Sequence, residues 1–235
     1  MANPKQNHEN DNKLDNSSEE RSLGEAFADR LEELLGLEAN FILDHDEEYT
    51  EENGWRIDRY NTELPSESPG EPVPNGSWEL AKEVLYRYEF PDPNLITGFY
   101  RDNVPLKDRR MLLRAKFLFF VFELGVRINK VIDETIANVD DRGPARIWGY
   151  SYYTLEGHFE MGEITFSVLK FLDSGKVEFR IHAYSQTGTI RNIFYRIGFA
   201  IFGRRLQVRF SRQALKRMQM LVNMRLEQSA ATPSK

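Results

Sequence analysis

The spacing of apolar residues divides this chain into three parts. Between residues 111 and 186 apolar and polar residues alternate, which is the period of β-strands. After residue 192 apolar residues recur at intervals of three and four, which is the period of an amphipathic helix. Before residue 55 the chain is mostly polar and acidic, apart from one helical pattern at about residues 22–36. The pattern predicts one α+β domain behind an acidic N-terminal segment.

The local signals predict the elements of that domain. We expect strands over residues 55–64, 147–155, 163–172 and 176–186, a helix over 78–88 capped by Ser77, and a short extended segment over 95–101. Asp173-Ser174-Gly175 predicts a hairpin. The run from Met111 to Ile136 is apolar on both faces near residues 117–124, which predicts a strand buried on both sides with a bulge or turn at Gly125. The final helix is expected over residues 192–228, with a break near Gly203.

These elements predict three regions along the chain. Residues 1–54 form an acidic tail carrying the helix at 22–36, residues 55–228 form the domain, and residues 229–235 are a flexible C-terminus. Residues 1–20 are too polar to build a core and are expected to be disordered. The helix at 22–36 is either a flexible appendage or a docking helix that covers a groove on its own domain or on a partner.

The composition narrows the class of protein. The chain has no cysteine, which excludes disulfides, thiolate metal sites and a cysteine nucleophile. It has no apolar run of eighteen residues and no secretory leader, so a cytoplasmic location is expected. Residues 1–54 carry four basic and sixteen acidic residues, and the whole chain has a net charge of −6. The domain is therefore mildly basic, with about +6 charges.

The block from Trp148 to Glu163 combines glycines, tyrosines, a histidine and carboxylates in sixteen residues. It resembles the signature of a family known only as a domain of unknown function, DUF1990, and the resemblance extends over about residues 55–218. The matching residues are Gly149, Tyr150, Tyr152, Thr154, Leu155, Gly157, His158, Gly162 and Glu163. Gln186 departs from the family, which has a basic residue and then proline after Ser185. The resemblance implies a fold but no reaction.

The order of elements is also similar to that of the helix-grip (START-like) superfamily. That resemblance implies an α+β fold in which a curved antiparallel sheet wraps a long C-terminal helix and leaves a cavity for a hydrophobic ligand. The candidate ligand-binding residues are Tyr150, Tyr152, Thr154, His158, Glu160, Glu163, Phe179 and Ile181. Alternation places Tyr150 and Tyr152 on one face of their strand and Tyr153 on the other.

His158 and Glu163 support more than one interpretation. They are candidates for an acid–base pair, or they hydrogen-bond the turn through Gly157 and Gly162. A metal site formed with Glu160 is a further alternative, but the spacing is not that of a helical His-Glu-x-x-His site, and zinc deaminases need cysteines. We therefore predict no metal and no cofactor. His182, on the polar face of its strand, is expected to be solvated.

The last helix is strongly basic. Nine Lys or Arg residues and no acidic residue occur between Arg191 and Leu226, with aromatic residues among them. We expect Val208, Leu215, Met218 and Val222 to point inward and the basic residues Arg205, Arg209, Arg212 and Lys216 to point outward. The outer face is either simply solvated or contacts a polyanion, with an anionic membrane favoured over nucleic acid.

These observations lead to one favoured function and two alternatives. The favoured function is a non-catalytic module that binds a hydrophobic or amphipathic small molecule. One alternative is a small pocket enzyme that uses His158 and Glu163. The other is a peripheral membrane or polyanion-binding protein that uses the basic helix. No feature of the sequence predicts the ligand or the oligomeric state.

Overall fold

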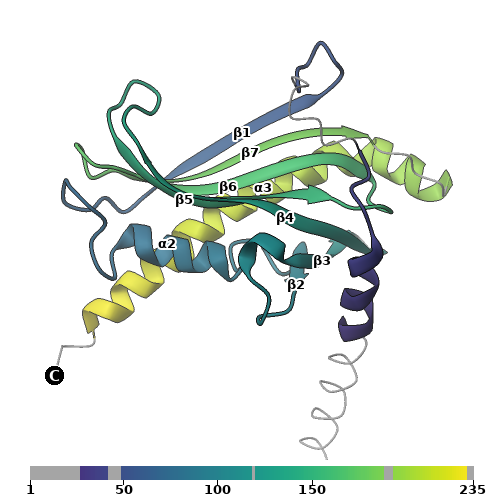
Figure 1. Ribbon diagram of the computed structural model, residues 1–235, viewed down its shortest axis with the longest axis horizontal. Helices are drawn as coiled ribbons and strands as arrows, with labels where there is room; N and C mark the ends of the chain where they lie inside the picture. Colours follow the sequence, from purple (N-terminus) through teal and green to yellow (C-terminus); the bar gives the residue numbers. More distant parts are fainter. Residues whose placement is uncertain (1–26, 42–48, 118–119, 188–192, 232–235) are drawn as a thin grey trace, which may run out of the picture.

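Seven antiparallel strands form one sheet in the order β1-β7-β6-β5-β4-β3-β2 (Figure 1). The structure is a computed structural model that describes residues 27–41, 49–117, 120–187 and 193–231, without the side chains of residues 117, 120, 187 and 193–203. The strands are β1 (Arg56–Leu64), β2 (Ile96–Phe99), β3 (Arg110–Phe117), β4 (Phe120–Ile136), β5 (Ala145–Thr154), β6 (Glu160–Phe171) and β7 (Val177–Thr187). The helices are α2 (Ser77–Tyr86) and α3 (Ile193–Ala231), with 3-10 turns at Leu34–Gly36 and Leu106–Asp108.

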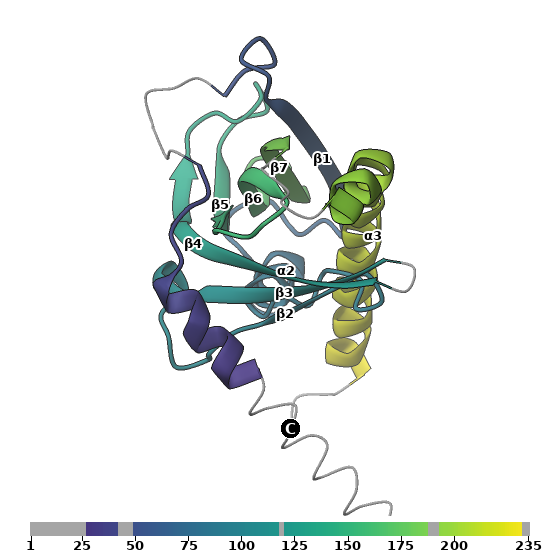
Figure 2. The ribbon, with the colours of Figure 1, turned by 90° about the vertical axis from the view of Figure 1, so that its right-hand side faces the viewer.

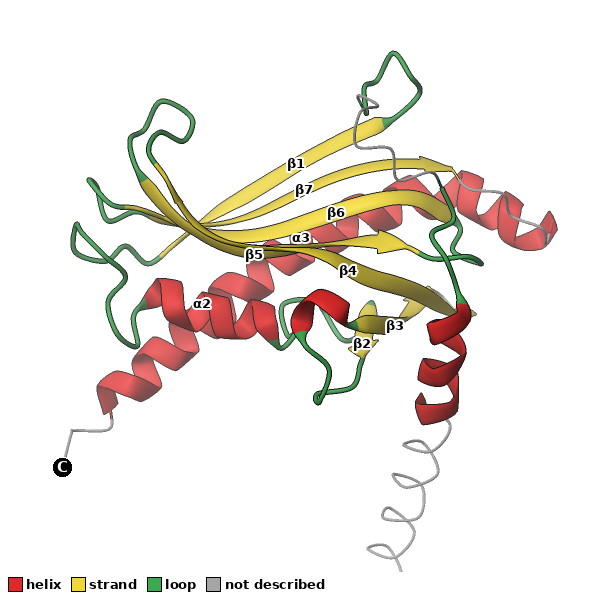
Figure 3. Cartoon of the chain, in the orientation of Figure 1, coloured by secondary structure: helices red, strands yellow, loops and turns green. Residues whose placement is uncertain are grey.

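The sheet curls around α2 and α3, so that it has an inner face toward these helices and an outer face away from them (Figure 2). Helices and strands are coloured separately in Figure 3, where α3 runs under the sheet. The predicted fold class, a curved antiparallel sheet with a long C-terminal helix, is confirmed. The hairpin predicted at Asp173-Ser174-Gly175 is also present between β6 and β7, with Gly175 at φ +72°.

The register decides which side chains enter the core. Tyr152 lies opposite Ile164, and Phe166 lies opposite both Tyr150 and Ile181. These residues share the inner face, where they pack against α2 and α3. Rings from the segment after α2 fill the space between them, since the Phe90 ring lies 4.7 Å from Phe166 and 5.4 Å from Phe179. Aromatic rings therefore pack together inside a core that also contains many aliphatic side chains.

Helix α2 begins differently from the prediction. Ser77 is the first helical residue rather than the N-cap, and the Ser77 hydroxyl is buried without a described partner. The carboxylate of Glu67 accepts the Trp78 N–H at 2.7 Å instead. This carboxylate also pairs with the buried ammonium of Lys170 at 2.7 Å. A side chain from the preceding loop thus accepts a hydrogen bond from an N–H group at the start of the helix that has no partner within the helix.

The strand predicted through residues 117–124 is wrong. Strands β3 and β4 are separate and pair antiparallel, with Phe117 opposite Phe120, and residues 118–119 lie outside the described part. Val121 is 48% exposed, so this stretch is not buried on both faces. The bulge lies between Ile128 and Lys130, not at Gly125. The run is apolar on both faces because it forms two paired strands rather than one central strand.

The predicted break in the last helix is also wrong, because α3 is continuous through Gly203. A glycine costs only about 1 kcal/mol in a helix interior, which packing of the helix can offset. The predicted faces of α3 are correct. Met218 and Val222 are fully buried, Val208 and Leu215 are partly buried, and the four basic residues Arg205, Arg209, Arg212 and Lys216 are exposed.

The N-terminal helix docks on its own domain. Residues 27–33 are helical and lie beside β3 and β2, on the side of the molecule away from α3 (Figure 2). Phe27 stacks on Phe99 with ring centroids 3.9 Å apart, and Leu31 and Leu34 pack on Leu112. A Cβ at Gly125 would lie 2.8 Å from Leu34, so Gly125 permits this close approach. Of the two alternatives left open by the sequence, the structure shows the docking helix; residues 1–20 lie outside the described part.

Candidate functional site

The signature block, Trp148 to Glu163, covers most of β5, the turn between β5 and β6, and the start of β6. His158 lies in this turn, where its ring Nδ1 accepts the Glu160 backbone N–H at 3.0 Å. The backbone N–H of His158 donates to the Leu155 carbonyl at 3.1 Å. Gly157 has φ +84°, a conformation that favours glycine. Thr154 Oγ1 accepts the Gly162 N–H at 3.1 Å. These residues of the signature build the turn.

Asn40, from the N-terminal segment, binds this turn from outside. Its amide donates to the Glu160 carbonyl at 2.7 Å and accepts from the Thr154 hydroxyl at 2.6 Å. The Glu156 N–H is donated to the Glu38 carbonyl at 2.9 Å, and Ala39 forms an isolated bridge with Leu155. The N-terminal segment therefore hydrogen-bonds to the signature turn, which the sequence pattern did not predict.

Glu163 faces the opposite side of the sheet from Glu160. On the outer face its carboxylate accepts the Asn129 amide at 2.7 Å and interacts with Tyr184. Burial, followed by the charge of Glu163, raises the pKa of Tyr184 to about 12. The Tyr184 ring also stacks on Tyr49 at 4.7 Å. Glu163 thus belongs to a hydrogen-bonded cluster on the outer face.

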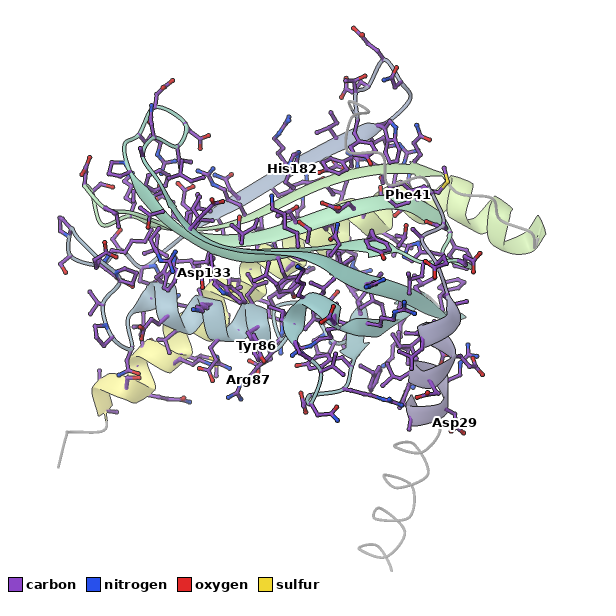
Figure 4. The ribbon with its side chains drawn as sticks, viewed as in Figure 1. Asp29, Phe41, Tyr86, Arg87, Asp133 and His182 are labelled. Atoms are coloured by element: carbon purple, nitrogen blue, oxygen red, sulfur yellow. The ribbon has the colours of Figure 1, made fainter. Side chains whose placement is uncertain are left out.

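His158 and Glu163 therefore do not form the predicted pair. His158 orders the turn as expected, but Glu163 binds Asn129 and Tyr184 instead. His182 also differs from its prediction: its Nε2 is enclosed without a described partner, and burial lowers its pKa. Figure 4 shows His182 on the outer face, on the far side of the sheet from Tyr86 and Arg87. The Tyr184 ring lies 5.4 Å from the His182 ring, and Thr165 is opposite His182 on β6.

A second polar cluster lies on the inner face, where β6 begins and α3 crosses. Glu160 points inward, and its carboxylate accepts a hydrogen bond from the Gln207 amide of α3. Burial raises the pKa of Glu160, opposed by this hydrogen bond and by the charges of Arg56 and Arg204. The Gln207 Oε1 atom is enclosed and has no hydrogen-bond partner among the described residues. We call Glu160, Gln207, Asp58, Arg204 and Tyr152 the inner polar cluster.

Asp58 and Arg204 close one side of this cluster. Arg204 donates to both carboxylate oxygens of Asp58, one of them at 2.8 Å. Burial opposes ionisation of Asp58, but the guanidinium outweighs it, so the pKa of Asp58 is lowered. Asp58 also accepts the Tyr60 hydroxyl at 3.2 Å. The ion pair fixes α3 against β1 beside Glu160.

Tyr152 connects the cluster to the core. Its hydroxyl lies 3.5 Å from that of Tyr88, and burial raises its pKa to about 12, so the phenol is neutral. Tyr150, two residues earlier on the same face of β5, is 1% exposed, and its hydroxyl donates to the Leu85 carbonyl at 3.2 Å. Phe179 and Ile181 are 0% and 1% exposed. The structure thus places three of the predicted ligand-binding residues, Tyr150, Phe179 and Ile181, in the packed core.

The ligand-binding candidates predicted from the sequence include Tyr152 and Glu160 of the inner polar cluster but not Gln207, Asp58 and Arg204. One available signal was the helical spacing of Gln207, because it lies on the same face of α3 as Ser211, Ala214 and Met218. A glutamine on a buried helix face is unusual. Asp58 and Arg204 are 146 residues apart, and no local pattern joins them.

A surface hollow of about 310 Å³ on the exposed side of α2 is lined by Trp78, Glu79, Lys82, Glu83 and Tyr86. Nowhere in the described ranges do three or more His, Asp or Glu side chains gather in a way that would hold a metal ion. Among the described helices, none is both long and apolar enough to cross a membrane.

These features define an α+β protein of helix-grip type with a polar cluster between its sheet and its C-terminal helix. The chain belongs to the family described as "Domain of unknown function (DUF1990)", whose profile matches residues 45–217. The predicted family is thereby confirmed. Asn40 and the docked N-terminal helix lie before the matched residues.

Two of the solved structures to which this chain is distantly similar are the following. The crystal structure of Ara h 8.0201 has 9% sequence identity and a TM-score of 0.41, over 73% of this chain and 99% of that one. The crystal structure of the Mll3558 protein from Rhizobium loti has 12% identity and a TM-score of 0.34, over 72% of this chain and 96% of that one. A search of curated proteins gave no match. Both likenesses are too distant to extend the description of the site.

The environment of His158 predicts how the free energy of unfolding depends on pH. Burial lowers the pKa of His158 from 6.5 to about 4, opposed by the Glu160 backbone carbonyl, which lies 3.1 Å from Nδ1. Between these values the unfolded chain binds a proton that the folded chain does not. The free energy of unfolding is therefore at its full value above about pH 6.5 and should fall as the pH falls toward 4.

Urea unfolding of the wild type and of His158→Gln at several pH values between 7.5 and 4 measures this effect. We expect His158→Gln to cost about 1–3 kcal/mol at pH 7.5, from the lost hydrogen bond. We also expect the variant to lose less stability on acidification. His182 contributes to the slope of both proteins, so the difference isolates His158. Equal slopes would contradict this assignment.

Proposed function

We propose that this protein binds an amphipathic small molecule at the inner polar cluster, between β6 and α3. The observation that carries the proposal is the enclosed Oε1 atom of Gln207, beside the Glu160 carboxylate, which has no hydrogen-bond partner in the part of the chain that the structure describes. A buried polar atom without a hydrogen bond costs about 1–3 kcal/mol, so such atoms call for a partner. A bound molecule that donates a hydrogen bond would supply it.

The surroundings of the cluster suit an apolar body. Tyr60, Ile164 and Phe210 are apolar or aromatic side chains that pack against the core but remain partly exposed. Small-molecule sites typically combine such apolar walls with a few convergent polar groups. Glu160 and Gln207 would bind the polar end of the molecule, while these side chains would contact its apolar part.

The polar end is expected to be a hydrogen-bond donor such as a hydroxyl or a neutral amine. Gln207 Oε1 can only accept, and the Glu160 carboxylate accepts when it is ionised. A ligand carboxylate would place a negative charge beside Glu160, although Arg56 and Arg204 lie near. The site thus favours an uncharged donor over an acid of the same chain length. We propose a cytoplasmic, non-catalytic role for this module.

Titration of the full chain with N-phenyl-1-naphthylamine, an apolar fluorophore with one N–H donor, tests the proposal. We expect saturable binding that dodecanol displaces more effectively than dodecanoate. In Gln207→Leu the affinity for the probe should fall about tenfold, because the accepting oxygen is lost. The preference for dodecanol should disappear as well.

Gln219→Leu is the matched control, because Gln219 lies on the same helix and donates to the Glu63 carbonyl away from the cluster. Its affinity should equal that of the wild type. Absence of saturable binding to the full chain, or equal affinity in the wild type and Gln207→Leu, would remove the proposed site. Circular dichroism melts of both variants show whether each is folded.

A further inference from the structure

The outer side of α3 carries a straight basic stripe, formed by Arg205, Arg209, Arg212 and Lys216. At 100° per residue these four side chains fall within a sector of about 60° and span about 16 Å of the helix. All four are exposed. Helix α3 lies along one side of the molecule, away from the docked N-terminal helix (Figure 2). Neither the inner polar cluster nor the core uses this face.

The charges of the stripe are not neutralised within the described part of the chain. None of the four side chains forms an ion pair there, whereas the neighbouring Arg204 pairs with Asp58 and Arg225 pairs with Glu89. No acidic residue occurs between Arg191 and Leu226. The whole chain nevertheless has a net charge of −6. The stripe is therefore a local positive surface on an acidic protein, which orients the molecule toward a negatively charged partner.

Exposed apolar residues follow the stripe along one edge of the helix. Met220 and Met224 are 45% and 46% exposed and lie about 50° and 90° around the helix from the middle of the stripe, and Glu227 is the first acidic residue after it. A helix side that combines arginines with flexible apolar side chains is the arrangement by which amphipathic helices lie on lipid surfaces. Single-stranded nucleic acid would require aromatic side chains on which bases stack, and the stripe has none among its described residues.

We propose that the basic stripe and its two methionines dock this protein on an anionic lipid bilayer. The four basic side chains would lie against the headgroups, and Met220 and Met224 would enter the boundary between headgroups and acyl chains. Each basic residue near an anionic surface increases the partition coefficient about fivefold. Four residues together give a factor of several hundred, which makes the binding measurable and sensitive to salt.

Co-sedimentation of the full chain with phosphatidylcholine vesicles, with and without 30% phosphatidylserine, tests the proposal at about 50 and 300 mM salt. We expect binding only to the anionic vesicles, weakening as salt rises. A variant with Arg205, Arg209, Arg212 and Lys216 changed to Gln should lose at least about a hundredfold in partition coefficient. Met220→Ser with Met224→Ser should lose about fivefold at both salt concentrations, since apolar contacts are not screened.

The control changes Arg59, Lys107, Lys116 and Lys130 to Gln. These residues are also exposed and form no ion pair in the described part of the chain, so the control alters the net charge equally. Its partition coefficient should stay within about twofold of the wild type, because these charges lie on other faces. Equal losses in both variants, or no binding of the full chain at low salt, would overturn the proposal. Tighter binding to a 20-base-pair DNA duplex than to the vesicles would assign the stripe to nucleic acid and overturn it as well.

Discussion

Replacing Lys170 with Met should destabilise the protein more than any other single change at a polar residue. Lys170 is 0% exposed, and its ammonium donates to Glu67 and to the Glu71 carbonyl, each at 2.7 Å. Removing one partner of a buried pair leaves the other charge buried, which typically costs about 3–5 kcal/mol. For a domain of this size that cost lowers the melting temperature by roughly 6–20 °C.

Glu67 makes the effect larger than a lost ion pair alone. Its carboxylate also accepts the N–H groups of Val73 and Trp78, at 2.9 and 2.7 Å, so it fixes the loop before α2. Thermal unfolding followed by circular dichroism measures the loss. Lys176→Met is the matched control, because Lys176 pairs with Glu63 at the surface and surface pairs contribute at most about 1 kcal/mol. Similar losses in the two variants would show that Lys170 has no special role.

The second large effect is expected at Gly149, in the signature block. A Cβ at this position would lie 2.2 Å from the Phe166 carbonyl oxygen and 2.8 Å from the Ser167 Cα, both on β6. Backbone atoms cannot give way as the end of a side chain can, so Gly149→Ala must separate β5 from β6. Overpacking of this kind costs about 3 kcal/mol. Urea unfolding at pH 7.5 measures the change.

Gly36→Ala is the control for Gly149→Ala. Nothing lies within 4 Å of a Cβ at Gly36, and its φ is not positive. Its stability should change by less than about 1 kcal/mol. A loss in Gly149→Ala no larger than that in Gly36→Ala would contradict the close approach of the two strands.

The local pattern was sufficient for most of the fold. Alternation along residues 145–187 predicted β5, β6 and β7, because each strand buries one face. Helical spacing likewise predicted the buried Met218 and Val222 of α3. It failed between β3 and β4, because a run that is apolar on both faces does not show where a chain reverses. It failed at Ser77 because the group that caps α2 is Glu67, in a distant part of the loop.

The candidate site was less predictable than the fold. His158 and Glu163 are close in sequence, but the turn and the alternation of β6 give them different partners. Glu160, two residues from His158, points inward and meets Gln207 of α3. Asn40 binds the signature turn across 120 residues of sequence. Contacts of this range depend on how sheet, helix and N-terminal segment assemble, which no local pattern contains.

Native mass spectrometry of the full chain, purified without detergent, tests the central claim most directly. We expect a discrete adduct, a small molecule with an apolar body and a hydroxyl or amine, on the wild type and on Gln219→Leu. The same adduct should be absent or strongly reduced on Gln207→Leu, because the Gln207 Oε1 atom is the acceptor proposed to hold its polar end. An adduct retained equally by Gln207→Leu, or no adduct on any of the three proteins, would contradict a ligand site at the inner polar cluster.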